Sequence, residues 1–169
     1  MTAKRLAFFG VAIVVFGLDR ATKHHALSTL EPGERVAYLG EILSLAHVRV
    51  PGAAFGLLQS WSEETQRVAL GVLSLACVGL IVAFYRGLAP GEHSSAAALG
   101  AVLGGVVGNL LDRLLYGVGI ESLHLGAPSV EWLPDFSLSD LAIVLGVVTL
   151  IVELLASEMA ARAQERPRR

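Results

Sequence analysis

The sequence has little charge and almost no cysteine. Asp, Glu, Lys and Arg make up 17% of its 169 residues, while hydrophobic residues make up 54% and the mean hydropathy is +0.63. A soluble domain carries roughly 25% charged residues, so this composition argues against an ordinary aqueous surface and favours a membrane protein. The single cysteine, Cys77, excludes a disulfide framework. The net charge of -2 does not favour a nucleic-acid partner.

The hydrophobic residues of the sequence are gathered in long runs. We predict four membrane spans, at about residues 6–26, 68–85, 94–116 and 138–155, because a helix needs ~20 apolar residues to cross a bilayer. The first run resembles a secretion signal, but Asp19-Arg20 follows it and no small-residue cleavage site is present. We therefore expect an uncleaved first span within a single all-α membrane domain over residues 1–169.

The segment at about 28–66 has a different character. Its apolar pieces are short and are separated by Pro32-Gly33, Gly40 and Pro51-Gly52, which are turn signals. We predict a small β-rich region outside the membrane here, followed by a helix that starts near Ser62 with acidic residues in its first turn. The segment 117–137 is predicted to be a loop.

The basic residues indicate how the spans are oriented. Four spans place both termini on one side, together with Lys4, Arg5, Arg86 and the arginines after residue 161. The positive-inside rule makes that side cytoplasmic. The β-rich region and the 117–137 loop then lie on the outer side.

Polar residues from three of the predicted spans fall near that outer face. In a lipid-embedded helix such residues are costly and usually mark the working site. A transporter would instead place polar groups near the middle of the spans, where this sequence has none. The residues concerned are Asp19, Lys23, Asn109, Asp112, Arg113, Glu121 and Asp140.

Glu121 and Asp140 are the two carboxylates without an obvious partner. If they meet, burial and repulsion would raise one pKa, so that the pair shares a proton. One carboxylate could then activate water while the protonated one polarises a carbonyl, which is aspartic-peptidase chemistry. The alternatives remain open: Asp140 as a helix cap among Ser137 and Ser139, and Glu121 as an ordinary loop carboxylate.

Asn109 and Arg113 lie four residues apart, on one helix face with Gly105. Such a face could hold a peptide backbone, with the guanidinium donating. The alternative is helix–helix packing, in which glycines allow close approach and Asn bonds across helices; we favour packing for Gly104 and Gly108.

Asp19 and Lys23 are also four residues apart and can form an ion pair, and Asp112 is expected to neutralise a nearby cation. Glu121-x-x-His124 and His24-His25 could suggest a metal. The glycine and proline around the first motif argue against a long helix there, and no zinc-protease motif is present, so we expect neither a metal nor another cofactor.

Four motifs together resemble those of lipoprotein signal peptidase (signal peptidase II). They are Leu18-Asp19-x-x-Thr22-Lys23, Gly52-Ala53-Ala54-Phe55-Gly56, Gly104-Gly105-x-x-Gly108-Asn109-Leu110-x-Asp112-Arg113 and Leu133-Pro134-x-Phe136-x-x-Ser139-Asp140. The resemblance implies a four-span aspartic endopeptidase of the bacterial inner membrane, with its site near the periplasmic face. Such enzymes cut prolipoproteins before a diacylglyceryl-modified cysteine, among membrane lipids, and are targets of cyclic peptide antibiotics.

The resemblance also implies roles for individual residues. It places the two catalytic acids at Glu121 and Asp140, and the substrate-binding positions at Asp19, Lys23, Gly105, Asn109, Arg113 and Ser137.

Four positions depart from the family pattern. Glu121 replaces an Asp, Val50 and Ser137 each replace an Asn, and Ser139 stands where Ala is usual. The alternative hypothesis is therefore a catalytically weak or inactive paralogue that binds a lipoprotein signal peptide or a peptide inhibitor.

Overall fold

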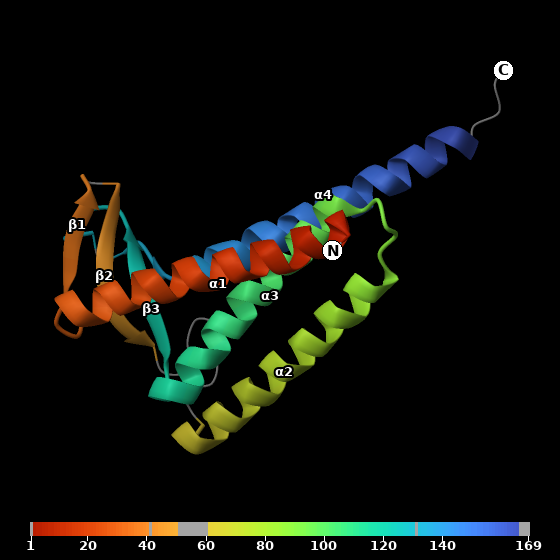
Figure 1. Cartoon of the computed structure of the whole chain (residues 1–169). Coiled ribbons are helices and arrows are strands. Elements are labelled where there is room, and N and C mark those ends of the chain that lie inside the picture. Colours follow the sequence, from red (N-terminus) through yellow and green to blue (C-terminus); the bar gives the residue numbers. More distant parts are fainter. Residues whose placement is uncertain (1, 41, 51–60, 131, 166–169) are drawn as a thin grey trace.

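The computed structural model describes residues 2–40, 42–50, 61–130 and 132–165 of the chain. Four long helices account for most of it: α1 (Ala3–Thr29), α2 (Glu63–Gly87), α3 (His93–Tyr116) and α4 (Leu138–Glu165). Helices α1, α3 and α4 pack along one another, while α2 diverges from them (Figure 1). A small sheet lies at one end of this bundle, and the start of α1 and the end of α4 lie toward the other (Figure 1).

Local sequence sets where helices α2 and α3 begin or end. The Ser62 hydroxyl accepts a hydrogen bond from the Thr65 amide at 3.3 Å, and Glu63 and Glu64 occupy the first turn of α2, which confirms the predicted helix start. Helix α3 ends at Tyr116 and is capped by Gly117, whose positive φ of 75° allows a left-handed cap.

Glycines on α3 allow its two neighbours to approach closely. A Cβ atom at Gly104 would lie 2.6 Å from the Ala12 carbonyl oxygen of α1, and one at Gly105 would lie 2.5 Å from the Ser139 carbonyl oxygen of α4. Gly108 is likewise closed off by the Ser139 hydroxyl and the Asp19 carboxylate. The two faces of α3 are thus fitted to different helices, and the packing role predicted for Gly104 and Gly108 is confirmed.

Four antiparallel strands form the sheet, in the order β1-β2-β3-β4. They are β1 (Arg35–Leu39), β2 (Leu43–Val50), β3 (Gly119–Leu125) and β4 (Asp135–Phe136). The register between β2 and β3 shifts between Leu45 and Val48, and such a bulge increases the local twist of a sheet.

The sheet corrects one of our expectations. The segment 117–137, predicted to be a loop, contributes β3 and β4, so the β region is not confined to residues 28–66. The buried face of β3 carries Ser122 and His124 as well as Ile120. Because two of these three buried residues are polar, the strand lacks the apolar alternation by which a half-buried strand is recognised.

Three of the four helices, α2, α3 and α4, are long and apolar enough to cross a membrane. Helix α1 is not among them, and its second half carries Asp19, Arg20 and Lys23. The fold is therefore mostly helical with a small antiparallel sheet, and a fourth span at α1 stays a prediction. The Gly52-Ala53-Ala54-Phe55-Gly56 motif lies outside the described residues.

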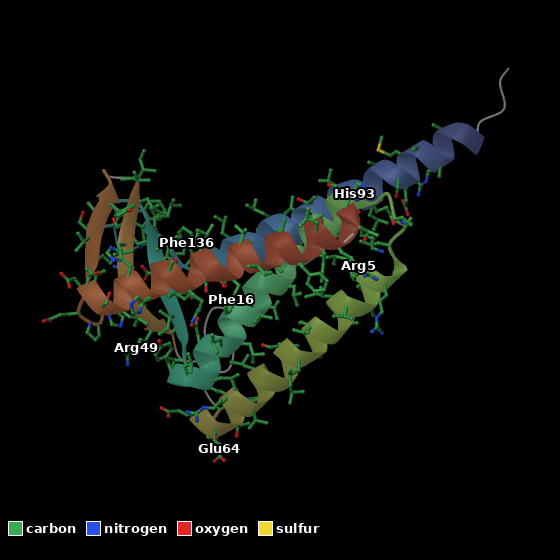
Figure 2. The ribbon with its side chains drawn as sticks, viewed as in Figure 1. Arg5, Phe16, Arg49, Glu64, His93 and Phe136 are labelled. Atoms are coloured by element: carbon green, nitrogen blue, oxygen red, sulfur yellow. The ribbon has the colours of Figure 1, made fainter. Side chains whose placement is uncertain are left out.

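At the end away from the sheet, α1 meets the end of α2. The Phe8 and Tyr85 rings stack with their centroids 4.1 Å apart, and the Lys4 ammonium group lies 4.8 Å from the Tyr85 ring centroid. Figure 2 shows Arg5 and His93 at this same end, while Phe136 lies where α4 meets the sheet. Aromatic contacts therefore join the helices at the end away from the sheet, whereas polar contacts join them at the sheet end.

Candidate active site

Glu121 and Asp140 meet although they come from different elements. Glu121 lies on β3 and Asp140 in the first turn of α4. Burial raises the pKa of Glu121 to about 8, and the neighbouring Asp140 adds to the rise through its charge and through a hydrogen bond between the two side chains. Within the described residues, the Oε2 atom of Glu121 is buried without a hydrogen-bond partner. The arrangement favours a pair of carboxyl groups that holds one proton.

Asp140 is held by the start of its own helix. Its Oδ2 atom accepts hydrogen bonds from the Ser137 amide at 2.9 Å and from the Ser137 hydroxyl at 2.5 Å, while the Asp140 amide donates back to the same hydroxyl at 3.2 Å. This reciprocal pattern is a capping box. Asp140 therefore does belong to a helix cap, as the alternative hypothesis expected. Its Oδ1 atom takes no part in the cap and faces α3 instead.

Asn109 connects Asp140 to the charged part of α1. Its side-chain amide donates to Oδ1 of Asp140 at 2.8 Å, and its side-chain oxygen accepts from the Lys23 ammonium group at 3.2 Å. Lys23 thereby fixes which way the amide of Asn109 points. The carboxylate of Asp140 thus accepts hydrogen bonds from Asn109 on α3 as well as from Ser137.

Lys23 belongs to a buried quartet of charges between α1 and α3. It pairs with Asp19 at 2.9 Å and with Asp112 at 2.6 Å, and Arg20 pairs with the same two acids at 2.8 Å and 2.5 Å. The side chains of Asp19, Lys23 and Asp112 are at most 1% exposed. Two acids and two bases balance, so the quartet can be buried without net charge.

The quartet confirms the predicted Asp19–Lys23 pair and the neutralising role of Asp112. The quartet also contacts the first turn of α4 next to Asp140, because Asp19 accepts a hydrogen bond from the Ser139 amide at 3.0 Å. The sequence analysis did not select Arg20. Its spacing of three residues from Lys23, which puts both cations on one helix face, was the available signal.

The remaining predicted residues lie around the pair. Arg113 donates to the backbone oxygen of Asn109 at 2.8 Å, and its Nε atom is buried without a partner in the described part of the chain. Its guanidinium is close enough to interact electrostatically with Glu121 and Asp140. Gly105 packs against α4 at Ser139 and Ile143. A metal is not indicated: within the described ranges, no group of three or more His, Cys, Asp or Glu side chains could hold an ion.

The fold and the site together define a helical membrane protein in which two carboxyl groups converge where the helices meet the sheet. Comparison with known proteins identifies the family to which this chain belongs. The family model for signal peptidase (SPase) II matches residues 11–156. The chain belongs to the signal peptidase II family, whose members are aspartic proteases that process lipoproteins.

Curated relatives match over nearly the whole chain. The lipoprotein signal peptidase of Moorella thermoacetica is 37% identical over 150 residues, covering 89% of this chain and 93% of the relative. That of Rhodococcus jostii is 37% identical, covering 88% and 72%, and that of Pseudoalteromonas atlantica is 32% identical, covering 90% and 92%. The alternative of an inactive, purely binding paralogue receives no support from these comparisons.

Two solved structures share the fold. A bacterial membrane enzyme determined by the in meso method at 2.3 Å resolution aligns with a TM-score of 0.77 and 21% identity, covering 94% of this chain and 92% of that one. A second, at 1.9 Å resolution, aligns with a TM-score of 0.73 and 23% identity, covering 86% and 90%. At such identities the likeness concerns the fold alone.

Proposed function

We propose that this protein is a signal peptidase II that removes the signal peptide from bacterial prolipoproteins, cutting before the diacylglyceryl-modified cysteine, with Glu121 and Asp140 as its catalytic acids. The observation that carries the proposal is the meeting of these two half-buried carboxyl groups from β3 and α4. Family membership supports the substrate class.

We assign different parts to the two acids. Glu121 keeps its proton at neutral pH because its pKa is raised to about 8, so it can donate a hydrogen bond to the scissile carbonyl oxygen. Asp140, held as an acceptor by Ser137 and Asn109, takes a proton from water. The resulting hydroxide adds to the carbonyl carbon, the C–N bond then breaks, and the amine leaves with a proton returned by the pair.

The surrounding polar groups are suited to bind the peptide. Arg113 has a buried Nε–H without a partner in the described residues, and its charge interacts with those of both acids, so we assign it to a substrate carbonyl. Gly105, Asn109, Ser137, Asp19 and Lys23 complete the proposed binding site, the last four by orienting Asp140 or its neighbours. We place the site at the periplasmic face of the inner membrane, with both termini in the cytoplasm and α1 as a fourth span.

A gel-shift assay on a lipidated prolipoprotein tests the proposal. Purified wild-type protein should shorten the substrate, and Asp140→Asn and Glu121→Gln should each abolish cleavage, while Glu158→Gln, which removes an exposed carboxylate on α4, should cleave like wild type. Cleavage of equal rate by wild type and Asp140→Asn would reject the catalytic pair.

Glu121→Asp tests whether the site is adapted to the longer acid. The shorter side chain draws the carboxyl group back from Asp140, and a displacement of about 1 Å can cost on the order of 10²-fold in rate. We expect cleavage to fall by about that factor. A strong increase would mean that Glu121 places its carboxyl group poorly.

A further inference from the structure

Three charged or titratable side chains that are not part of the catalytic pair meet on the sheet. Arg35 on β1 donates from Nε and Nη2 to the two carboxylate oxygens of Asp135 at 2.9 Å and 2.6 Å. His124 on β3 contacts the same carboxylate through Nδ1 at 3.0 Å, and its ring is fully buried. We name Arg35, His124 and Asp135 the sheet clasp.

The sheet clasp joins strands that are far apart in the sheet. Strands β1 and β4 are its two edges, with β2 and β3 between them, and a flat sheet would separate them by about 14 Å at the usual strand spacing. A two-pronged contact between Arg35 and Asp135 therefore requires the sheet to curl. The bulge in β2 supplies additional twist.

The clasp is also adjacent in sequence to both catalytic acids. His124 follows Glu121 by three residues on β3, and Asp135 precedes Asp140 by five. Strand β4 has only two residues, and its register with β3 consists of two pairs, Leu123 with Phe136 and His124 with Asp135. So short a ladder fixes its position weakly, and the contacts to Asp135 reinforce it at the point where the chain enters the Ser137–Asp140 turn.

We propose that Arg35 and His124 are positioning residues of the catalytic site: by holding Asp135 they fix β4 against β3, and so set the separation and the electrostatic balance of Glu121 and Asp140. This inference rests on the proposed function, since it concerns the same pair. Neither residue belongs to the motifs by which the family is recognised in the sequence.

The proposed electrostatic effect of the clasp depends on the charged groups that face Glu121. They are Asp140 from α4, Lys23 from α1, Asp135 from β4 and Arg113 from α3. The negative charge of Asp135 adds to the rise in the pKa of Glu121, less than burial and Asp140 do. Because Arg35 is paired with Asp135, it offsets part of that charge. Removing Asp135 and removing Arg35 should therefore move the proton affinity of Glu121 in opposite directions.

Two variants of the full chain in detergent or proteoliposomes separate positioning from mere stability. Asp135→Asn and Arg35→Gln both break the clasp, and both should lower kcat on a lipidated prolipoprotein by about tenfold or more. The alkaline limb of the pH–rate profile should move to lower pH in Asp135→Asn and to higher pH in Arg35→Gln, each by on the order of half a pH unit. Limbs that move the same way, or do not move, would overturn the proposal.

Conservative substitutions at Arg35 and His124 distinguish a loss of positioning from a general loss of folding. Arg35→Lys keeps the charge but loses the two-pronged contact, so we expect a lower kcat with an unmoved limb. His124→Asn retains a donor near the position of Nδ1 and should retain more activity than His124→Leu. Equal loss in the two His124 variants, with wild-type thermal stability in both, would contradict the role of His124.

A measurement that needs no turnover distinguishes this inference from the proposed function. Infrared titration can follow the carbonyl band of the protonated Glu121 carboxyl, assigned by its loss in Glu121→Gln. Opposite shifts of that band in Asp135→Asn and Arg35→Gln would support the electrostatic coupling even if no prolipoprotein were cleaved. Cleavage by wild type with unshifted bands would support the function and reject the coupling.

Discussion

Asn109 of α3 donates a hydrogen bond to Asp140 of α4 at 2.8 Å while its own oxygen accepts from Lys23 of α1. One amide therefore connects the Ser137–Asp140 turn to the buried ion pairs between α1 and α3. Replacing Asn109 with Ala removes both bonds and leaves Oδ1 of Asp140 free to turn. We expect kcat to fall by on the order of 10²-fold, with a smaller change in KM. Steady-state kinetics on a lipidated prolipoprotein would measure both, and an unchanged kcat would contradict the role given to Asn109.

Ser137 is expected to tolerate Asn better than Ala. Ala loses both hydroxyl contacts to Asp140, and the loss of a helix cap costs about 1 kcal/mol. Asn is also a good capping residue and keeps an oxygen for the Asp140 amide. Thermal unfolding in detergent should show a lower Tm for Ser137→Ala than for Ser137→Asn, and cleavage rates should follow the same order. The reverse order would show that the capping box does not support the site.

The pH dependence of stability should report Glu121. The unfolded chain loses this proton near the ordinary value of 4.5, whereas the folded protein keeps it until about 8. The unfolded state is thus favoured progressively as pH rises from about 4.5 to about 8, and the contribution becomes constant above that. Glu121→Gln, which stays neutral, should raise Tm relative to wild type at pH 8 and change it little at pH 4. An equal effect at both pH values would contradict a buried acid at this position.

The buried charges should respond strongly to the loss of one acid. Asp112→Asn leaves Arg20 and Lys23 to share Asp19, so one buried positive charge is uncompensated. Breaking such a pair typically costs about 3–5 kcal/mol. Denaturation in detergent should show this loss, whereas Glu158→Gln, which removes an exposed pair with Arg162, should have little effect. Similar stability of the two variants would mean that the buried ion pairs do not hold α1 to α3.

Two glycine-to-alanine substitutions are expected to change the thermal stability of the protein differently. Gly104→Ala would place a methyl group 2.6 Å from the Ala12 carbonyl oxygen, which forces α1 away from α3. At Gly71 of α2 an added Cβ would meet no described residue within 4 Å, and Ala is the better helix former by about 0.5–1 kcal/mol. We expect a lower Tm for Gly104→Ala and an equal or higher one for Gly71→Ala. A neutral Gly104→Ala would refute close packing at this position.

The sequence predicted much of the site because its signals are local. Asp19 and Lys23 are one helical turn apart, and a helix brings that spacing together whatever surrounds it. The Ser137–Asp140 capping box is equally local. By contrast, Arg35 and Asp135 are one hundred residues apart and sit on opposite edges of the sheet, and no periodicity encodes such a contact. Strand β3 escaped prediction since polar groups line its buried face.

Long apolar helices with a few polar groups near one end follow from the amino-acid sequence, because helix formation and lipid solubility depend on composition and short spacings. The meeting of Glu121, from a strand, with Asp140, from a helix, depends on how α1, α3, α4 and the sheet pack together. The reason is physical: a pKa of about 8 for Glu121 arises from burial and from a second charge brought close by packing, and neither is a property of any single segment.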